Sequence, residues 1–439
     1  MKFKVRRSIL PIANCSLLIP FYPQKCIISV HSFYFLWYIY KQQKGYLHTN
    51  CGFIELVGAN VHRQLNHETL KKIFYVPVII LMLMPPEIFA QAKSALPLRV
   101  AVAGITHGHA TWILGRKDKK DIELVGIFEK NRDLGERSSK QFGISNKLFY
   151  DNLEKMLDAV KPEAVVAFGS IYEHMAVVEA CAPRHIHVMV EKPLAVSLQH
   201  ALRMEALAKQ YGIHILTDYE TSWYPTTEKT WQLVNDSNAV GNIRKAVFHH
   251  GHQGPKEIGC SKEFLEWLTD PVQNGGGALI DFGCYGANIM TYLMRGEMPV
   301  SVTAVTQHFK PAVYPKVDDE ATIILSYPNT QAIIQASWNW PFGRKDMEVY
   351  GDSGYLIIKN SHDLVLKSAA MKTEQGSSVN EKDVDVYTDP FSYLYGVIRG
   401  NIQLKEFGLY SLHNNIIVVR ILEAARESAK LGKNVVMKE

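Results

Sequence analysis

Residues 98–114, LRVAVAGITHGHATWIL, decide the fold. They begin with an apolar run over 98–103, which is typical of a strand buried on both faces of a sheet. Gly104 ends this run, and a helical segment follows over about 109–115. The stretch therefore predicts a strand, a tight turn and a helix in direct succession.

The same strand-and-helix unit recurs downstream. Further apolar strands are predicted over 122–128, 164–168, 187–190 and 213–217, and helices over 133–142, 174–181 and 198–210. Strands that alternate with helices pair in parallel through right-handed crossovers. Residues 96–220 are therefore predicted to form a doubly wound Rossmann domain.

The pattern changes after about residue 220. Strands are predicted in meander-like succession over 246–250, 300–309, 321–327, 331–338 and 345–350, with helices over 281–294 and 415–430. Such an order favours a large, mostly antiparallel sheet with helices packed on it. Residues 221–439 are therefore predicted to form a second, α+β domain within an α/β protein.

The composition is that of an ordinary globular protein. Of the 439 residues, 47% are hydrophobic and 21% are charged, which excludes general disorder, collagen-like structure and a disulfide-dense scaffold. Residues 1–95 hold 11 Lys or Arg against 3 Asp or Glu, whereas the remainder is slightly acidic. The main body therefore lacks the positive charge that nucleic-acid binding requires.

The first 95 residues do not match a folded domain. Residues 1–54 contain no acidic residue, and 1–69 are interpreted as a non-native or disordered extension, with Leu70 at the position of the true start. Over 70–95, Lys71 and Lys72 precede an apolar run (73–84) and a small-residue cleavage site at 90–92, which predicts a secretory signal peptide. The run is too short to span a membrane, and its prolines disfavour a core helix. With only three cysteines in the body, the expected location is the periplasm or another exported compartment, with no membrane association after cleavage.

The turn after the first strand stands where a dinucleotide fingerprint would stand. Glycines there let the backbone approach a pyrophosphate at a helix N-terminus, and Glu129 at the end of the second strand can accept the ribose hydroxyls, which favours NAD over NADP. Thr106 and His109 break the usual glycine spacing, so a purely structural turn is an equal alternative.

Two further motifs lie where ligands bind. Glu191-Lys192-Pro193 follows the fourth strand, and ligands of doubly wound sheets bind at the carboxyl ends of strands; a solvated strand end is the alternative. In GGGALIDFGCY (275–285), Asp281 and Tyr285 are four residues apart and share one helix face; a helix-start charge and a packing residue are the alternative.

Together these motifs resemble the Gfo/Idh/MocA oxidoreductases, the family of glucose-fructose oxidoreductase and inositol dehydrogenase. The likeness runs from about Leu98 to Val436 and includes His174, Glu191-Lys192-Pro193, GGGALIDFGCY and VDDEAT (317–322). The family implies hydride transfer to or from a nicotinamide. The cofactor residues so implied are Gly104, Thr106, His107, Gly108, His109, Glu129, His174, Glu191, Lys192 and Pro193.

By this resemblance, Lys192 polarises the reacting oxygen, while Asp281 and Tyr285 handle the substrate hydroxyl and its proton. Many relatives carry His at the position of Tyr285, and the glucose-fructose branch looks like the Tyr version. Because tyrosine titrates near 10, a Tyr base needs a nearby cation, and Lys192 is the candidate. The resemblance also implies that residues 221–439 present an open-faced sheet, bind the substrate and pair with another copy in a homo-oligomer.

Histidines and aromatic residues are the remaining candidates for substrate binding. His250 and His252 would face the same way on a strand and are interpreted as substrate-lining residues, with core or surface histidines next and a metal pair last. Trp223, Tyr224, Trp338 and Trp340 could form a stacking floor for a pyranose ring; buried aromatics without a ligand are the equal alternative.

The sequence thus predicts an exported, nicotinamide-dependent oxidoreductase that oxidises a secondary hydroxyl of a sugar, sugar derivative or glycoside, or reduces the ketone. Because free NAD is not expected outside the cytoplasm, the cofactor is expected to stay tightly bound. The alternatives are an NAD-dependent glycoside hydrolase that works by transient oxidation and elimination, and a non-catalytic sugar-binding protein on the same scaffold.

Overall fold

The computed structural model describes residues 96–438 except 118, 385 and 388. The predicted extension (1–69) and signal peptide (70–95) lie outside the described residues. Within the described part, no helix combines the length and the apolar character that crossing a bilayer would require.

A parallel sheet forms the first part of the described chain, in the order β3-β2-β1-β4-β5-β6. Its strands are β1 (Leu98–Ala103), β2 (Ile122–Phe128), β3 (Phe149–Tyr150), β4 (Ala164–Ala167), β5 (His187–Glu191) and β6 (Ile215–Asp218). The chain winds outward from β1 to β3 and then from β4 to β6, so the order reverses between β1 and β4. This is the doubly wound arrangement that the sequence predicts, and its ligand crevice lies at this reversal.

Helices cover both faces of the parallel sheet. They are α5 (Ala110–Leu114), α6 (Arg132–Phe142), α7 (Leu153–Val160), α8 (His174–Cys181) and α9 (Leu198–Tyr211). The side chains of Val100 and Val102 pack into one hydrophobic core, whereas Ala101 and Ala103 pack into another. The apolar run of β1 is therefore explained by burial on both sides.

The second sheet has the order β14-β13-β12-β11-β7-β10-β9-β8-β15. Its strands are β7 (Ile243–Gly251), β8 (Ser301–Gln307), β9 (Glu320–Ser326), β10 (Gln331–Ser337), β11 (Arg344–Gly351), β12 (Gly354–Ile358), β13 (Asp363–Ser368), β14 (Gln375–Ser378) and β15 (Val435–Val436). The prediction of a mostly antiparallel sheet is confirmed. The prediction of a meander is wrong, because β7 lies between β10 and β11 and pairs in parallel with β10.

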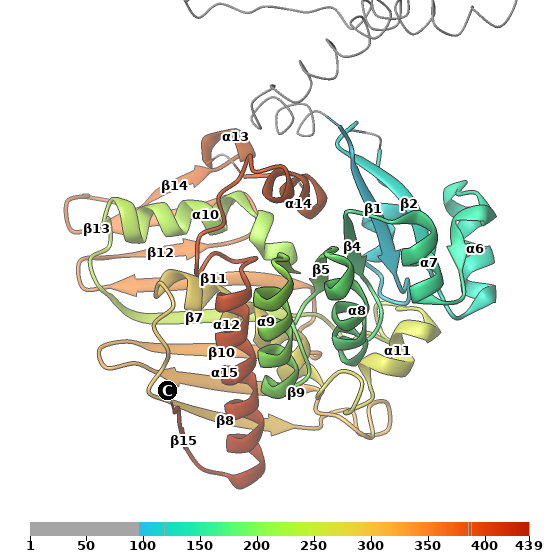
Figure 1. Cartoon of the computed structure of the whole chain (residues 1–439). Helices are drawn as coiled ribbons and strands as arrows, with labels where there is room; N and C mark the ends of the chain where they lie inside the picture. The colour runs from blue at the N-terminus through green and yellow to red at the C-terminus, as the bar shows by residue number, and fades with distance from the viewer. Residues whose placement is uncertain (1–95, 118, 385, 388, 439) are drawn as a thin grey trace, which may run out of the picture. The chain divides into compact units, whose positions relative to one another are not determined.

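One face of this sheet is covered by two long helices, α12 (Ala278–Leu293) and α15 (Leu412–Leu431) (Figure 1). Every residue of α12 is buried, which explains its apolar and small side chains. Shorter helices complete the domain: α10 (Pro225–Trp231), a π-helical turn (Gln232–Asp236), α11 (Lys262–Leu268), α13 (Glu381–Val384) and α14 (Pro390–Ile398).

The C-terminal helices also return to the parallel sheet. Ile416 and Val419 of α15 belong to the hydrophobic core that α8 and α9 form on that sheet. After α14, Arg399 donates two hydrogen bonds to Glu163, at 2.7 and 2.9 Å. These contacts join the two sheets, so the ends of β5 and of α12 meet in a defined geometry.

Candidate active site

A buried ion pair joins the two domains. Lys192 follows β5 at the carboxyl end of the parallel sheet, and Asp281 lies in the first turn of α12. The Lys192 Nζ atom donates to Asp281 Oδ1 at 2.5 Å and to the Asp281 carbonyl oxygen at 3.1 Å, and each side chain is 6% exposed. Trp338 Nε1 donates to the second carboxylate oxygen at 2.9 Å. Both sites predicted from separate motifs are therefore one site.

Tyr285 lies one helical turn beyond Asp281. Its ring centroid is 5.2 Å from Lys192 Nζ and 5.4 Å from Lys345 Nζ. The rings of Tyr219 and His250 pack edge-on against it, at centroid distances of 5.5 and 5.7 Å. The structure thus brings the three predicted catalytic residues together.

The site holds Lys192 and Asp281 in their charged forms. Burial has the largest single effect on the pKa of Lys192 and would lower it, but the charge and hydrogen bond of Asp281, together with the charges of Cys284 and Glu191, outweigh burial and the pKa is raised. Burial would raise the pKa of Asp281, but the charge and hydrogen bond of Lys192 keep it lowered. Burial, followed by the negative charges of Glu220 and Glu191, raises the pKa of Tyr285 well above its usual value. Tyr285 is therefore a protonated phenol near neutral pH.

The start of α12 is fixed by Asp318, from the VDDEAT motif. Its carboxylate accepts hydrogen bonds from the backbone N–H groups of Gly277 and Leu279, at 3.0 and 2.7 Å, and its carbonyl accepts one from Ala278 at 2.9 Å. A Cβ atom on Gly277 would lie 1.8 Å from that carbonyl oxygen, so only glycine fits there. Two motifs that are distant in sequence thus position Asp281 and Tyr285.

The turn after β1 is built for close backbone approach. Gly104 has φ +76°, and a Cβ atom there would lie 2.9 Å from the backbone of Gly169. A Cβ atom on Gly108 would meet nothing within 4 Å, so the turn is open at this point. Helix α5 spans only five residues. A pyrophosphate would therefore bind mainly to the accessible backbone of the turn. The dipole of the short helix α5, expected from the sequence to take part, contributes less.

The Glu129 side chain stabilises the same turn through hydrogen bonds. Its two carboxylate oxygens accept hydrogen bonds from the backbone N–H groups of Ile105 and Asn131, at 3.0 and 2.7 Å. Because a carboxylate has about four acceptor positions, it can still accept ribose hydroxyls. Burial raises the pKa of Glu129 above its usual range.

A cavity of about 350 Å³ opens beside this turn, at the carboxyl ends of β1, β2 and β4. Its lining includes Gly104, Phe128, Lys130, Gly169, Glu173 and His174. The His174 Nδ1 atom is hydrogen-bonded to the Leu194 carbonyl at 3.2 Å, and Nε2 has no partner among the described residues. With the open turn, this cavity fits the adenosine half of a dinucleotide.

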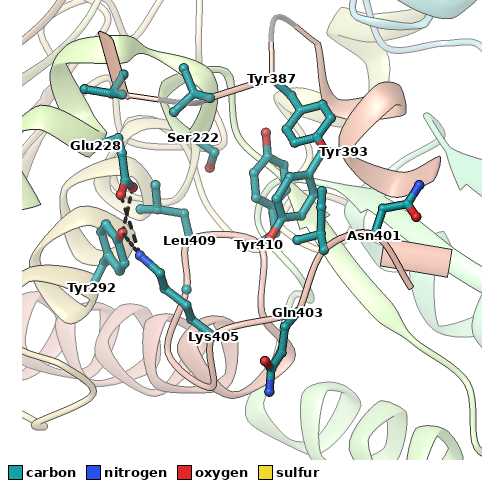
Figure 2. A pocket seen from close by; sticks show the side chains of 14 residues that line it. Ser222, Glu228, Tyr292, Tyr387, Tyr393, Asn401, Gln403, Lys405, Leu409 and Tyr410 are labelled. Atoms are coloured by element: carbon teal, nitrogen blue, oxygen red, sulfur yellow. Dashed lines mark hydrogen bonds and ion pairs between the residues drawn. The ribbon is translucent and has the colours of Figure 1, made fainter. Parts of the chain in front are cut away.

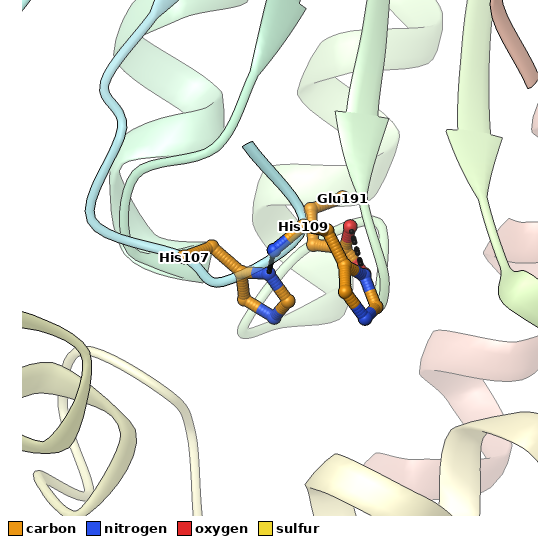
Figure 3. Close-up of side chains that lie close together, drawn as sticks. All are labelled: His107, His109 and Glu191. Carbon is orange, nitrogen blue, oxygen red and sulfur yellow. Dashed lines mark hydrogen bonds and ion pairs between the residues drawn. The ribbon is translucent and has the colours of Figure 1, made fainter. Parts of the chain in front are cut away.

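His107, His109 and Glu191 form a cluster between the turn and Lys192 (Figure 3). His109 Nδ1 lies 3.0 Å from Glu191 Oε2, and the His109 backbone N–H donates to His107 Nδ1 at 3.0 Å. The ligand atoms lie within 4.8 Å of one another, as a metal site would require. However, a His107 Nδ1 that accepts a hydrogen bond leaves the ring hydrogen on Nε2, so this ring offers no free lone pair to a metal.

Thr106 and His107 also contact the second domain. Trp267 Nε1 of α11 donates to Thr106 Oγ1 at 3.0 Å, and the His107 ring packs edge-on against Phe264 at 4.4 Å. These two predicted cofactor residues therefore also join the turn to α11. The Lys192–Pro193 peptide bond is cis.

A second cavity of about 350 Å³ is the candidate substrate cleft, because it is lined by Phe282, which follows Asp281 in the chain, and by Lys345, whose Nζ atom lies 5.4 Å from the centroid of the Tyr285 ring. Its lining includes Glu220, Tyr224, His252, Phe282, Arg344 and Lys345. Glu220 forms an ion pair with Lys345 and accepts a hydrogen bond from the Tyr224 hydroxyl. The Glu220–Lys345 pair was not predicted, because its members are 125 positions apart and follow no motif.

Four of the six predicted substrate residues do not line this cleft. His250 is fully buried against Phe248 and Tyr285, because its position on β7 faces the helices rather than solvent, so the predicted substrate contact is wrong. Trp338 is also fully buried and is held by Asp281 and Tyr314, so it is not part of a stacking floor. Trp223 packs edge-on against Trp112, and Trp340 lies under Arg344 at 4.4 Å. Of the predicted residues, Tyr224 and His252 line the cleft.

A third cavity, of about 310 Å³, is rich in tyrosine and lies apart from this site (Figure 2). Tyr292, Tyr387, Tyr393 and Tyr410 line it. On one side the Tyr292 hydroxyl donates to Glu228 at 2.8 Å, and Lys405 Nζ lies 3.4 Å from the same hydroxyl. Glu228, Tyr292 and Lys405 thus form one hydrogen-bonded group at its edge.

The fold and the site define a two-domain, dinucleotide-binding oxidoreductase. Residues 98–219 match the family model for the NAD-binding Rossmann fold of this oxidoreductase family, and residues 230–357 match the GFO/IDH/MocA C-terminal domain. The chain belongs to the Gfo/Idh/MocA family.

Curated relatives are distant. Trans-1,2-dihydrobenzene-1,2-diol dehydrogenase from Xenopus tropicalis is 25% identical over 50% of this chain and 58% of its own length, so the match spans little more than half of that enzyme. The enzyme of the same name from Xenopus laevis is 28% identical over 60% of this chain and 77% of its own length. Glucose-6-phosphate 3-dehydrogenase from Bacillus subtilis is 24% identical over 45% of this chain and 53% of its own length.

Solved structures share the fold. An aldose-aldose oxidoreductase from Caulobacter crescentus, complexed with glycerol, has a TM-score of 0.65 and 21% identity, covering 78% of this chain and all of that one. An inositol dehydrogenase homologue from Azotobacter vinelandii, complexed with NAD+, has a TM-score of 0.67 and 17% identity, covering 78% of this chain and 98% of that one.

Proposed function

We propose that this chain is an exported, NAD-dependent oxidoreductase that oxidises a secondary hydroxyl of a sugar, sugar derivative or glycoside, or reduces the matching ketone. The observation that carries the proposal is the buried contact of Lys192 with Asp281, beside Tyr285, in a fold that also holds a cavity for the adenosine half of a dinucleotide and an open polar cleft. Relatives named for glucose 6-phosphate, a dihydrobenzenediol and myo-inositol support it, since each name denotes a ring compound with secondary hydroxyls.

In this proposal the side chains have distinct tasks. The Lys192 ammonium, held by Asp281, donates a hydrogen bond to the reacting oxygen and stabilises negative charge that develops on it. Tyr285 and the His252 ring bind the substrate as hydrogen-bond donors. A bound nicotinamide supplies the hydride acceptor for oxidation or the hydride donor for reduction.

NAD is proposed over NADP because the Glu129 carboxylate would repel a 2′-phosphate. We expect the dissociation constant of NAD to be at least about tenfold lower than that of NADP, and Glu129→Gln to narrow this preference. Titration of dinucleotide-free protein with each cofactor measures it. Equal affinities in the wild type would contradict the choice of NAD.

The activity is tested by adding a panel of sugars, polyols and glycosides to the purified chain and following nicotinamide absorbance. We expect reduction of the cofactor with at least one substrate and its loss in the Lys192→Met variant. Release of aglycone without net cofactor reduction would favour the hydrolase alternative. Ligand binding that Lys192→Met leaves intact, with no turnover, would favour a binding protein.

Export is tested by expressing the full chain in a Gram-negative host and sequencing the N-terminus of the mature protein. We expect the protein in the periplasmic fraction, with a mature N-terminus just after Ala92, and nicotinamide retained through purification. Cytoplasmic protein that keeps residues upstream of 60 would contradict export, and a cofactor-free product would contradict retention.

A further inference from the structure

We infer that His109, oriented by Glu191, is the proton acceptor for the substrate hydroxyl in this active site. The inference rests on the proposed function and adds to it a catalytic residue from the irregular glycine turn. His109 stands where a dinucleotide motif would carry its third glycine.

The geometry of the pair sets the chemistry of the ring. His109 Nδ1 lies 3.0 Å from Glu191 Oε2, and the Glu191 side chain is completely buried. When Nδ1–H donates to a carboxylate, the neutral ring carries its free lone pair on Nε2. Figure 3 shows Nε2 on the side of the ring away from Glu191. This is the arrangement that a general base requires.

The ring is both held and accessible. It stacks on Trp112 with a centroid distance of 3.6 Å and an interplanar angle of 16°, and the His109 backbone N–H is bound to His107 Nδ1. The His109 side chain is nevertheless 21% exposed, in contrast to the buried Glu191. The second oxygen of Glu191 has no hydrogen-bond partner among the described residues, so the carboxylate's one side-chain partner there is His109.

The other titratable groups at the site are poorer proton acceptors. Lys192 is a cation, Asp281 is a carboxylate stabilised by that cation, and Tyr285 is a buried phenol. His252 Nδ1 accepts a hydrogen bond from the Gly254 backbone N–H at 2.9 Å, which leaves its Nε2 as a donor. His250 is fully buried and does not reach the cleft. The neutral acceptor that remains is His109.

Burial keeps His109 neutral. Burial lowers its pKa well below the ordinary value, and the cations Lys192 and Lys345 act in the same direction, against the anions Glu220 and Asp281. Its direct neighbours are Glu191 of β5 and His107 of the turn. His109 is thus unprotonated at neutral pH and ready to accept a proton, and Glu191 stabilises the imidazolium that forms.

Oxidation of the alcohol breaks one C–H and one O–H bond as the carbonyl bond forms. A bound oxidised nicotinamide would accept the hydride, and His109 Nε2 accepts the proton and releases it to solvent. In the reverse reaction the imidazolium returns the proton to the oxygen.

The first test compares His109→Gln and Glu191→Gln with the wild type. We expect His109→Gln to lower kcat about 100-fold or more and to remove the fall in rate at acid pH, while the NAD dissociation constant changes less than about threefold. Glu191→Gln should keep part of the activity, and in its pH–rate profile the fall in kcat at acid pH should occur at a lower pH than in the wild type. Added imidazole should restore activity to His109→Gly. As a matched control, His413→Asn alters an exposed His–Glu pair and should leave kcat unchanged.

The second test needs no cofactor or substrate. Nitrogen-15 spectra of the histidine rings in the purified chain should show His109 with its hydrogen on Nδ1, and Glu191→Gln should shift that signal. A His109 hydrogen on Nε2, a kcat of His109→Gln within threefold of wild type, or a loss confined to NAD affinity would each overturn the inference. If the wild type itself has no oxidoreductase activity, the proposed function fails, whereas the spectra still decide whether the His109–Glu191 pair exists.

Discussion

At the level of single residues, the Lys192–Asp281 pair serves two separate purposes. It is a stabilising contact between two domains, and it holds an ammonium at the reacting position. Removal of Lys192 alone leaves the Asp281 carboxylate in the interior, with Trp338 Nε1 as its remaining hydrogen-bond donor among the described residues. The two purposes can be separated by substitution.

We expect Lys192→Met to lower the free energy of unfolding by about 3–5 kcal/mol, because it leaves the buried Asp281 carboxylate without its cation. The double variant Lys192→Met with Asp281→Asn should regain most of that stability while kcat stays at least about 100-fold below wild type. Urea unfolding and initial rates on the same samples measure both. A double variant with restored activity would show that the lysine is only structural.

The pair also has a definite pH window. The pKa of Asp281 is lowered by folding, so its contribution is present above the unfolded value of about 3.9 and is lost as pH falls through the folded value. The pKa of Lys192 is raised by folding, so its contribution is present below about 10.4 and is lost as pH rises through the folded value. The stability difference between wild type and the double variant should therefore be flat between about pH 5 and 9.

The burial of His250 should make the stability of the fold sensitive to acid. Burial lowers its pKa to about 3, so the unfolded chain binds a proton below about pH 6.5 that the folded chain does not, and stability falls as pH falls. At pH 5 this costs about 2 kcal/mol relative to pH 7. Both ring nitrogens lack partners among the described residues, so His250→Phe should not destabilise at pH 7.

The measurement is the slope of unfolding free energy against pH. Between pH 6.5 and 4, this slope should be smaller in His250→Phe than in the wild type, by the amount that corresponds to about one proton bound on unfolding. His413→Phe, at an exposed position, should leave the slope unchanged. An unaltered slope in His250→Phe would mean that the buried ring already carries a proton.

Much of the site can be predicted from residues whose place follows from topology. Lys192 must emerge at the carboxyl end of the sheet, and Asp281 and Tyr285 must share a helix face. The pairs His109–Glu191 and Glu220–Lys345 could not be predicted, because each depends on how side chains orient across 82 and 125 positions of sequence. The burial of His250 was missed because periodicity on β7 does not say which face the helices cover.

At the level of elements, the position of α12 determines the site, and Asp318 fixes its start. We expect Asp318→Ala to cost about 1–2 kcal/mol of unfolding free energy and to lower kcat, since Asp281 and Tyr285 lose their registration with Lys192. Ser197→Ala removes the side-chain cap of α9, which accepts from His200 N–H. This control should cost similar stability and leave kcat unchanged; equal activity in both variants would contradict a positioning role for Asp318.

Elements with strong periodicity were predicted well, and those without it were missed. Strands β1, β2 and β7 to β11 and the long helices follow their apolar patterns. Strands β3 and β12 to β15 were not predicted. β14 is fully exposed and polar, and β3 and β15 have two residues each, so none of these three carries a buried alternation. In β12, Leu356 and Ile358 are buried alternately, but the strand has only five residues. The insertion of β7 between β10 and β11 is a long-range pairing that local sequence does not encode.

At the level of the whole molecule, the sheet face opposite α12 and α15 suits self-association. Six residues on neighbouring strands lie side by side in a row across this face, each paired with the next. In order they are Ile324, Ile333, Val247, Glu348, Ile357 and Val365, and all but Glu348 are apolar and partly exposed. Such an apolar stripe is typical of an interface between identical subunits. We expect a dimer or tetramer by light scattering.

Ile333→Glu should shift the molar mass toward the monomer, because it buries a charge at the centre of the row. Val272→Glu changes an exposed apolar residue outside the sheet and should leave the mass unchanged. A wild-type chain that is monomeric at micromolar concentration would contradict an interface on this face.

The most direct measurement is a crystal structure of the chain with bound NAD. We predict the pyrophosphate on the turn at Gly104–Gly108, the adenosine in the cavity beside Glu129 and His174, and the nicotinamide next to Lys192, facing the cleft that His252 and Lys345 line. A dinucleotide bound elsewhere, or a nicotinamide ring with no access to Lys192, would contradict it.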